Sequence, residues 1–262
     1  MRNNQSTNTA QSVLLDKLNR SIEGEVHKEA LYRYMLSTDG SIYQVQPTAV
    51  VYPRNSADVS ETLDLARRHE MPVHGRGAGS GLCGAALGAG IVLDFTRYMN
   101  RLVHLDPDER TFECEPGYRF GELEARLKAT GLFFPPDPSS GEYATFGGMF
   151  GTNASGAHSV KYGNTADYVL DAEVITGSGE ALRFSEVLSR PMAALSPFLQ
   201  RVAQLYRDNQ AVIESAYPSV RYNSSGYNLR GLVQDDRLDL RRLFAGSEGT
   251  LGITTRLKFR LI

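Results

Sequence analysis

The residues best suited to chemistry are the glycines between residues 75 and 90. Seven glycines fall in this stretch, and its densest part reads Gly75-Arg76-Gly77-Ala78-Gly79-Ser80-Gly81-Leu82-Cys83-Gly84. Glycine adopts positive φ angles and lets a ligand approach the backbone closely. Successive backbone N–H groups in such a loop form a concave site for an anion. The stretch therefore predicts a loop that holds a phosphate group, with a flexible connection between strands as the alternative.

The glycine stretch matches neither of two common phosphate-binding motifs. No Gly-Lys followed by Ser or Thr occurs in it, and it does not open a helix as a dinucleotide fingerprint does. Ser80 contributes a hydroxyl, and Arg76 supports either the loop itself or the ligand. Taken alone, the stretch does not distinguish one phosphate-containing ligand from another.

Two further runs of small residues follow the first. The run 135–163 begins with Pro135-Pro136-Asp137-Pro138, which is incompatible with a helix or a central strand. Its small residues would let a flat ring system lie against the backbone; the alternative is a long surface loop, which is uncommon unless it has a function. The run 244–252 precedes the last strand and, taken alone, is also consistent with an ordinary turn.

The elements that must position these runs alternate in the first half of the chain. Apolar segments predict strands at 49–52, 73–74 and 91–95, and Ser56 is expected to cap the helix between the first two. This order predicts an α/β unit. Before it, we expect a disordered tail over 1–11 and helices over 12–20 and 24–35.

The second half predicts a different arrangement. Residues 253–261 alternate between apolar and polar, which indicates a half-buried strand. We expect a free strand edge over residues 256–262 that could pair with a second copy of the chain. The other predicted elements are a strand over 111–115, helices over 120–130, 146–154 and 195–216, and a hairpin formed by 168–176 and 180–184.

Composition excludes several classes of protein. The 262 residues include 28 basic and 30 acidic side chains, a balance that argues against nucleic acid as the main partner. No apolar stretch approaches the roughly 18 residues of a membrane span, and the polar start lacks a signal-peptide core. Cys83 and Cys114 are too few for a disulfide framework or a cysteine metal site. We expect a cytoplasmic protein, with peripheral membrane association left open.

The three runs together resemble one family. In order and spacing they are similar to the FAD-binding (PCMH-type) domain of the p-cresol methylhydroxylase/vanillyl-alcohol oxidase superfamily, and within it to the D-lactate dehydrogenase/glycolate oxidase subunit group of FAD-linked oxidases. Glu115-Pro116-Gly117 and Lys161-Tyr162-Gly163 belong to the same ordered set, which spans about residues 45–262. Residues 39–44 further resemble large bacterial members that carry a C-terminal iron–sulfur domain.

The resemblance implies an α+β fold in which two α/β subdomains hold FAD between them. Residues 1–44 would form a tail and helical extension, 45–105 the first subdomain and 106–262 the second. Because the chain stops on a strand, we expect it to be a piece of a longer protein whose C-terminal cap domain, which closes the substrate side in relatives, is absent here.

The resemblance also implies a set of cofactor-binding residues. Residues 76–84 would wrap the pyrophosphate, Val174 and Ile175 would meet the adenine, and 248–249 would close the site. The residues near the ribityl chain and flavin would be Pro136, Asp137, Thr145, Gly147, Gly148, Asn153 and Gly156. The full set is His74, Arg76, Gly77, Ala78, Gly79, Ser80, Gly81, Leu82, Gly84, Pro116, Gly117, Pro136, Asp137, Pro138, Thr145, Gly147, Gly148, Asn153, Ala154, Gly156, Val174, Ile175, Glu248 and Gly249.

The mode of FAD attachment follows from one departure from the family pattern. Ser80 stands where some relatives carry a histidine bonded to FAD, so we expect non-covalent FAD. His74 and His158 lie near the motifs and stay open as alternative links. No metal is expected.

The implied activity is the oxidation of a D-2-hydroxy acid, of the D-lactate, glycolate or 2-hydroxyglutarate class, to the 2-oxo acid. Hydride would pass to flavin N5, and an electron acceptor or an iron–sulfur domain would be a partner. No residue of this chain is named as the catalytic base. One alternative is an FAD-carrying electron-transfer module without a substrate site, and another is a reductase of the enolpyruvyl-UDP-GlcNAc type.

Overall fold

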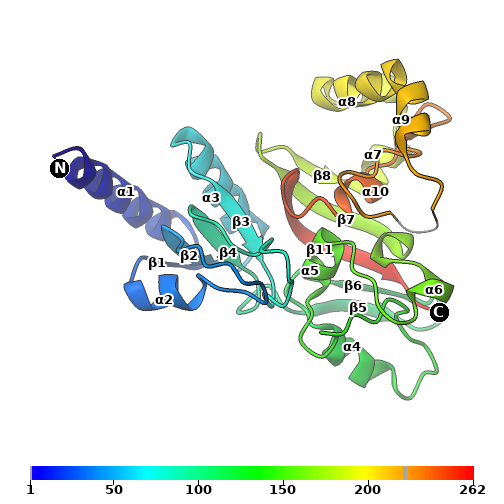
Figure 1. The fold of residues 1–262 in the computed structure, drawn as a ribbon, viewed down its shortest axis with the longest axis horizontal. Coiled ribbons are helices and arrows are strands. Elements are labelled where there is room, and N and C mark those ends of the chain that lie inside the picture. The colour runs from blue at the N-terminus through cyan, green and yellow to red at the C-terminus, as the bar shows by residue number, and fades with distance from the viewer. Residues whose placement is uncertain (1, 221–222) are drawn as a thin grey trace.

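Two β-sheets lie side by side in the protein (Figure 1), whose computed structural model describes residues 2–220 and 223–262. The first sheet is built from the N-terminal part of the chain and the second from the remainder. Helices pack on both sheets, so the arrangement confirms the predicted α+β fold class.

The first sheet has the strand order β1-β2-β4-β3. Both β2 and β3 run parallel to β4, while β1 pairs antiparallel with β2. The strands are β1 (Glu25–His27), β2 (Ala49–Tyr52), β3 (Val73–Arg76) and β4 (Ile91–Asp94), and the helices are α1 (Arg2–Ser21), α2 (Ala30–Met35) and α3 (Ser56–Arg68). Every residue of β2 and β4 is buried, as expected for parallel strands covered on both faces.

Helix α3, which joins β2 to β3, begins one residue earlier than its sequence signal indicates. The side chain of Asn55, not Ser56, accepts a hydrogen bond from the Asp58 N–H at 2.9 Å. Asn55 has extended backbone angles, which suit the N-cap, and asparagine is among the strongest N-cap residues.

The second sheet has the strand order β5-β6-β11-β7-β8, and all its pairs are antiparallel. Its strands are β5 (Leu102–Asp106), β6 (Thr111–Cys114), β7 (Val169–Thr176), β8 (Ala181–Arg183) and β11 (Gly252–Arg260). The predicted alternation of β11 is confirmed, since Ile253, Leu257 and Phe259 are buried between less buried neighbours. The predicted free edge is wrong, because β6 and β7 pair with the two sides of β11.

Smaller elements surround the second sheet. They are α4 (Phe120–Leu127), α5 (Phe146–Gly151), α6 (Ser159–Tyr162), α7 (Phe184–Ser189), α8 (Pro197–Asp208), α9 (Gln210–Ala216), α10 (Arg241–Phe244), the 3₁₀ turns at Thr165–Asp167 and Met192–Ala194, and the ribbon of β9 (Val233–Gln234) and β10 (Arg237–Leu238). In the described part of the chain, no helix is long and apolar enough to cross a membrane.

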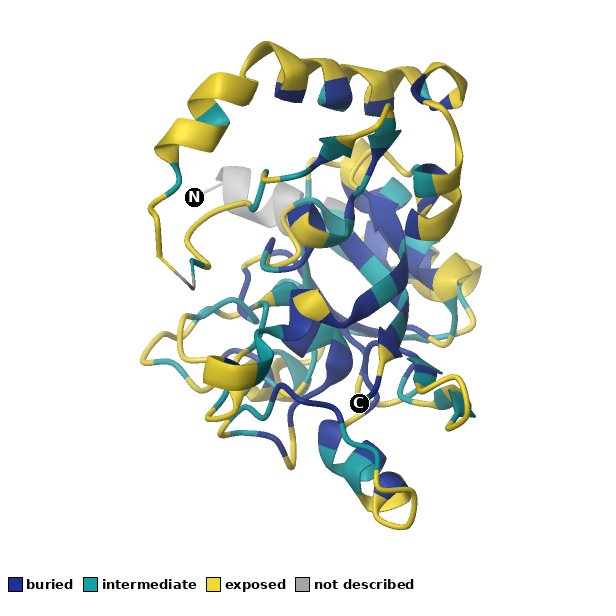
Figure 2. Ribbon diagram, turned by 90° about the vertical axis from the view of Figure 1, so that its right-hand side faces the viewer, coloured by how far each residue is buried: buried dark blue, intermediate teal, exposed yellow. Residues whose placement is uncertain are grey.

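Two hydrophobic clusters support the sheets, and Figure 2 shows buried residues gathered in the strands. In the larger cluster, the rings of Phe112, Phe134, Phe146 and Phe259 have centroids 4.9–5.8 Å apart. Ile253 packs instead into the cluster of the first sheet. Strand β11 therefore contributes to both cores.

The N-terminal region departs from the sequence prediction. The segment predicted as a disordered tail is helical from Arg2 onward, because no glycine or proline interrupts the chain before Ser21. The helix predicted over 24–35 is instead the short strand β1 followed by α2. Pairing with β2 fixes β1 as a strand, a tertiary contact that local spacing does not reveal.

Replacing Phe259 by Ala should lower the free energy of unfolding by about 3–5 kcal/mol, the usual cost of removing a buried phenylalanine side chain. The ring is fully buried in the aromatic cluster at the centre of the second sheet. Urea denaturation measures the change, with the exposed neighbour substitution Arg260→Ala as the control. An equal loss of unfolding free energy in the two variants would contradict the role of Phe259, and with it of β11, in the core of the second sheet.

Candidate functional site

A cavity lies between the two sheets where all three small-residue runs meet. Its volume is about 260 Å³, which is room for an organic ligand since a liquid water molecule occupies roughly 30 Å³. The lining consists of Gly75, Arg76, Gly77, Ala78, Gly79, Ser80, Gly81, Ala85, Ala86, Phe95, Pro116, Pro138, Ser140, Ala144, Thr145, Gly147, Gly148, Met149, Phe150, Gly151, Thr152, Ala154, Ser155, Phe244, Ser247, Glu248, Gly249, Gly252, Ile253 and Thr254. Segments as far apart in sequence as Gly75 and Thr254 thus share one site.

The structure brings a large part of the predicted site together. The predicted residues that line the cavity are Arg76, Gly77, Ala78, Gly79, Ser80, Gly81, Pro116, Pro138, Thr145, Gly147, Gly148, Ala154, Glu248 and Gly249. The predicted residues outside the lining are His74, Leu82, Gly84, Gly117, Pro136, Asp137, Asn153, Gly156, Val174 and Ile175.

For several predicted site residues outside the lining, the structure shows what they contact instead. Val174 and Ile175 are buried in the two hydrophobic clusters. A Cβ on Gly156 would lie 1.6 Å from the Asp137 carbonyl oxygen, so these backbones are in direct contact. The Asn153 side chain accepts a hydrogen bond from the Ala166 N–H at 2.9 Å, which joins the cavity wall to the turn before β7.

Four glycines of the lining form two physically different pairs. A Cβ on Gly77 would lie 2.0 Å from Thr145 Oγ1, and one on Gly147 would lie 2.6 Å from Pro116 Cβ. Packing between protein segments therefore requires these two glycines. A Cβ on Gly81 or Gly151 would meet no protein atom within 4 Å, and neither residue has a positive φ. These two positions keep open space at the cavity.

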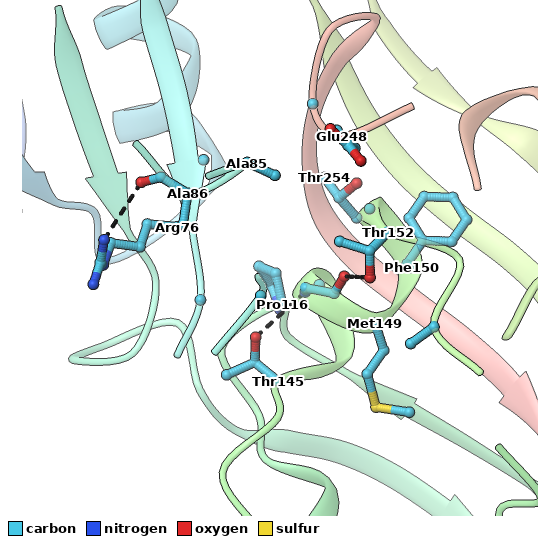
Figure 3. Close-up of a pocket in the computed structure, with 18 of the residues that line it drawn as sticks. Arg76, Ala85, Ala86, Pro116, Thr145, Met149, Phe150, Thr152, Glu248 and Thr254 are labelled. Carbon is cyan, nitrogen blue, oxygen red and sulfur yellow. Dashed lines mark hydrogen bonds between the residues drawn. The ribbon is translucent and has the colours of Figure 1, made fainter. Parts of the chain in front are cut away.

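The floor of the cavity includes the start of helix α5. Thr145 is its N-cap, and its hydroxyl accepts a hydrogen bond from the Gly148 N–H at 3.3 Å. The Thr152 hydroxyl donates to the Gly148 carbonyl at 2.9 Å (Figure 3). These bonds fix the short helix, which contributes three glycines, Met149 and Phe150 to the lining.

The guanidinium of Arg76 forms hydrogen bonds to carbonyl groups of the protein before and within the glycine stretch. Its Nη2 donates to the Thr38 carbonyl at 2.9 Å and its Nη1 approaches the Ala86 carbonyl at 3.4 Å. Figure 3 shows the guanidinium directed away from Glu248 and Thr254 on the opposite wall. Burial lowers the pKa of Arg76, and the negative charge of Asp94 opposes that shift.

Charged groups are scarce in the lining. Among the described lining residues, only Arg76 and Glu248 carry ionisable side chains, and Arg76 is 8% exposed with carbonyl partners. The remaining polar side chains are hydroxyls, and one pair, Ser80 and Ser140, bridges the two sides of the cavity with a 3.2 Å hydrogen bond. Such a lining suits binding through backbone and hydroxyl groups better than proton transfer by a side chain.

The predicted set of site residues omitted part of the lining, although most of the omitted residues lie within the three small-residue runs. The omitted residues are Ala85, Ala86, Phe95, Ser140, Ala144, Met149, Phe150, Gly151, Thr152, Ser155, Phe244, Ser247, Gly252, Ile253 and Thr254, while Gly75 was part of the glycine stretch but not of the predicted set. Phe244, Ser247 and Gly252 belong to the third run, so their position beside Glu248 was an available signal. Phe95 follows β4, and only the tertiary fold brings it to the cavity.

Comparison with known proteins gives a family and several relatives. A family model described as an FAD binding domain matches residues 47–185. The chain is 36% identical over 238 residues to D-2-hydroxyglutarate dehydrogenase of Escherichia coli strain K12, covering 86% of this chain and 23% of that protein. It is 32% identical over 222 residues to glycolate oxidase subunit GlcD of Bacillus subtilis strain 168, covering 84% and 38%. It is 28% identical over 221 residues to D-lactate dehydrogenase of Anaerostipes hadrus, covering 84% and 37%.

Solved structures share the fold. 6-Hydroxy-D-nicotine oxidase from Arthrobacter nicotinovorans matches with a TM-score of 0.64 and 20% identity over 92% of this chain and 42% of that one. An alkyldihydroxyacetonephosphate synthase matches with a TM-score of 0.63 and 23% identity over 90% and 38%. The chain thus spans well under half the length of these proteins and of the sequence relatives described above.

The two groups of glycines should respond differently to substitution. Gly77→Ala should lower the free energy of unfolding by about 1–3 kcal/mol, because its new methyl group overlaps Thr145. Gly81→Ala should change the free energy of unfolding by less than about 0.5 kcal/mol, because no protein atom is near. Thermal unfolding of the two variants measures both effects. A Gly81→Ala variant as unstable as Gly77→Ala would show that protein packing determines both positions.

Proposed function

This chain belongs to the family of FAD-binding domains, and we propose that it holds FAD, without a covalent bond, in the cavity between its two sheets. The observation that carries the proposal is the convergence of all three small-residue runs on that one cavity. The matched region, residues 47–185, includes two of the runs, and β11 brings the third to the same place.

The chemistry of the lining fits this cofactor. Gly81 and Gly151 leave space that no protein atom fills, which suits a bulky ligand pressed against the backbone. Gly81 lies in the glycine stretch and Gly151 in α5, so the ligand would extend between the sheets. Residues 76–84 would hold the pyrophosphate through backbone N–H groups, and residues 138–155 would lie along the flavin end.

The described lining of the cavity contains no histidine or cysteine that could form a bond to FAD, which supports non-covalent binding. Ser80 lines the cavity, but its hydroxyl is engaged with Ser140. His74 and His158 are not part of the described lining, and the His74 ring packs where a Cβ on Gly88 would lie. We therefore propose that hydrogen bonds and packing alone retain the cofactor.

We further propose that the chain is the FAD-carrying part of an enzyme that oxidises a D-2-hydroxy acid. Relatives named for D-2-hydroxyglutarate, glycolate and D-lactate support this class of substrate. Bound FAD would supply the acceptor for the hydride from the substrate. Residues of this chain would bind and orient the flavin and would exclude water from one side of it.

The scarcity of charge in the cavity favours a second candidate, an FAD-carrying module without a substrate site of its own. In the described lining, no histidine could take the proton of a substrate hydroxyl, and Arg76 already serves Thr38 and Ala86. Recognition of a substrate carboxylate would then require groups from outside this cavity. Cys83 is exposed, Cys114 is buried, and both are free thiols. Because free thiols are typical of reducing compartments, we propose a cytoplasmic location for the enzyme or the module.

The purified chain should carry or take up FAD. After reconstitution with FAD and removal of the excess, its visible spectrum should show flavin bands, and acid precipitation should release all the flavin into the supernatant. Gly81→Ala should bind FAD at least about tenfold more weakly while keeping its fold. A wild-type chain that remains colourless after reconstitution would overturn the proposal, and flavin retained in the acid pellet would overturn its non-covalent part.

Turnover distinguishes the enzyme from the module. If the cavity only carries flavin, the reconstituted chain should not reduce an artificial electron acceptor in the presence of D-lactate, glycolate or D-2-hydroxyglutarate. Free FAD with the same acceptor provides the background rate. Substrate-dependent reduction above that background would show that this chain contains a working substrate site and would exclude the module.

A further inference from the structure

A segment that precedes the family-matched region lies directly against the glycine stretch. Residues 38–44 fall outside 47–185, the region that the family model covers. The Gly40 N–H donates to the Gly79 carbonyl at 2.8 Å, and the Thr38 carbonyl accepts from Arg76 Nη2 at 2.9 Å. The segment therefore touches the loop through both its backbone and the arginine beneath it. We refer to residues 38–44 as the brace.

The contact between the brace and the loop is too close for a side chain. A Cβ on Gly40 would lie 2.8 Å from the Ser80 carbonyl oxygen and 3.0 Å from that of Gly81. Further along the brace, the Tyr43 ring lies 3.0 Å from the position of a Cβ on Gly84. Backbone thus packs on backbone at Gly40, and the Tyr43 ring packs on the loop at Gly84.

The brace is itself held in a defined shape. The Val45 N–H donates to the buried Ser37 carbonyl at 2.9 Å, and the Gln44 amide donates to the Ser37 hydroxyl at 3.1 Å. Within the segment, the Ser41 N–H donates to the Asp39 carboxylate at 2.8 Å. These hydrogen bonds hold the brace in one conformation, so the brace can fix the position of the loop that it contacts.

Arg76 links the brace to the first sheet. It is the last residue of β3, and its guanidinium lies under Gly79, where a Cβ would come within 2.5 Å of Nη2. One side chain thereby contacts the brace at Thr38, the loop at Gly79 and the returning chain at Ala86. Arginine suits this position because its planar group offers several donors in a fixed arrangement.

We propose that the brace is a positioning part of the cofactor site, and that Arg76 is a positioning residue that ties the brace to the loop rather than a ligand of the phosphates. This inference rests on the proposed function, since the loop is taken to hold the pyrophosphate of FAD. A glycine-rich loop has high conformational entropy when it is free. A loop fixed before binding has its N–H groups already aligned, which strengthens binding without adding a contact.

Gly40→Ala tests the brace without touching the cavity. Its methyl group meets the Ser80 and Gly81 carbonyls, so the brace must move away from the loop. The control is Gly177→Ala in the β7–β8 hairpin, which adds the same methyl group where no protein atom lies within 4 Å. Hydrogen–deuterium exchange of the FAD-free chain should then rise in residues 77–84 of the Gly40 variant and nowhere in the control.

FAD titration provides the second measurement. The dissociation constant of Gly40→Ala should increase at least about tenfold, while that of Gly177→Ala should stay within about twofold of the wild type. Arg76→Lys, which keeps the charge but loses the forked donors, should behave as Gly40→Ala does. Combining the two substitutions should weaken binding less than the product of the single effects, because both act on one contact.

Three results would overturn the inference. They are unchanged exchange in residues 77–84 of Gly40→Ala, a rise in exchange throughout that variant, and FAD affinity equal to the wild type despite a loosened loop. A wild-type chain that binds no FAD would instead overturn the proposed function. In that case the exchange measurement alone still decides whether the brace fixes the loop.

Discussion

The pairing of β11 with β6 on one side and β7 on the other holds the second sheet together. Without β11 the two flanking strands would have no common partner, because neither pairs with the other. The same strand inserts Ile253 into the core of the first sheet and Phe259 into the aromatic core of the second. Strand β7 does the same with Val174 and Ile175, so these two paired strands join the cores of the two sheets beside the cavity.

The cavity itself is built with few charges. Backbone groups, hydroxyls and small side chains form its walls, while Arg76 turns toward carbonyl groups of the protein. Burying an unpaired guanidinium would be costly, and its carbonyl partners reduce that cost. Nearby, burial raises the pKa of the Asp94 carboxyl, which hydrogen bonds from Thr96 partly counteract. Burial thus disfavours both charges, and hydrogen bonds from or to the protein offset part of that cost.

Local patterns in the sequence predicted much of the fold. The alternation of 253–261 indicated a half-buried strand, and the structure confirms it because one face of β11 meets a core. Patterns of this kind do not reveal pairing partners, so the strand was expected at an edge when it lies at the centre of its sheet. The segment over 24–35 was misread for the same reason, since only pairing with β2 makes β1 a strand.

The glycines show what the sequence could predict of the site and what it could not. Their density located the cavity, yet the sequence does not distinguish Gly77, which packs against Thr145, from Gly81, which faces open space. This distinction has a consequence for divergent relatives. Under the proposed function, a homologue that kept the fold but lost its ligand would still need glycine at the positions of Gly77 and Gly147, while other residues would be accepted at those of Gly81 and Gly151. The residues at these two pairs of positions would therefore distinguish homologues that still bind the ligand from homologues that have lost it.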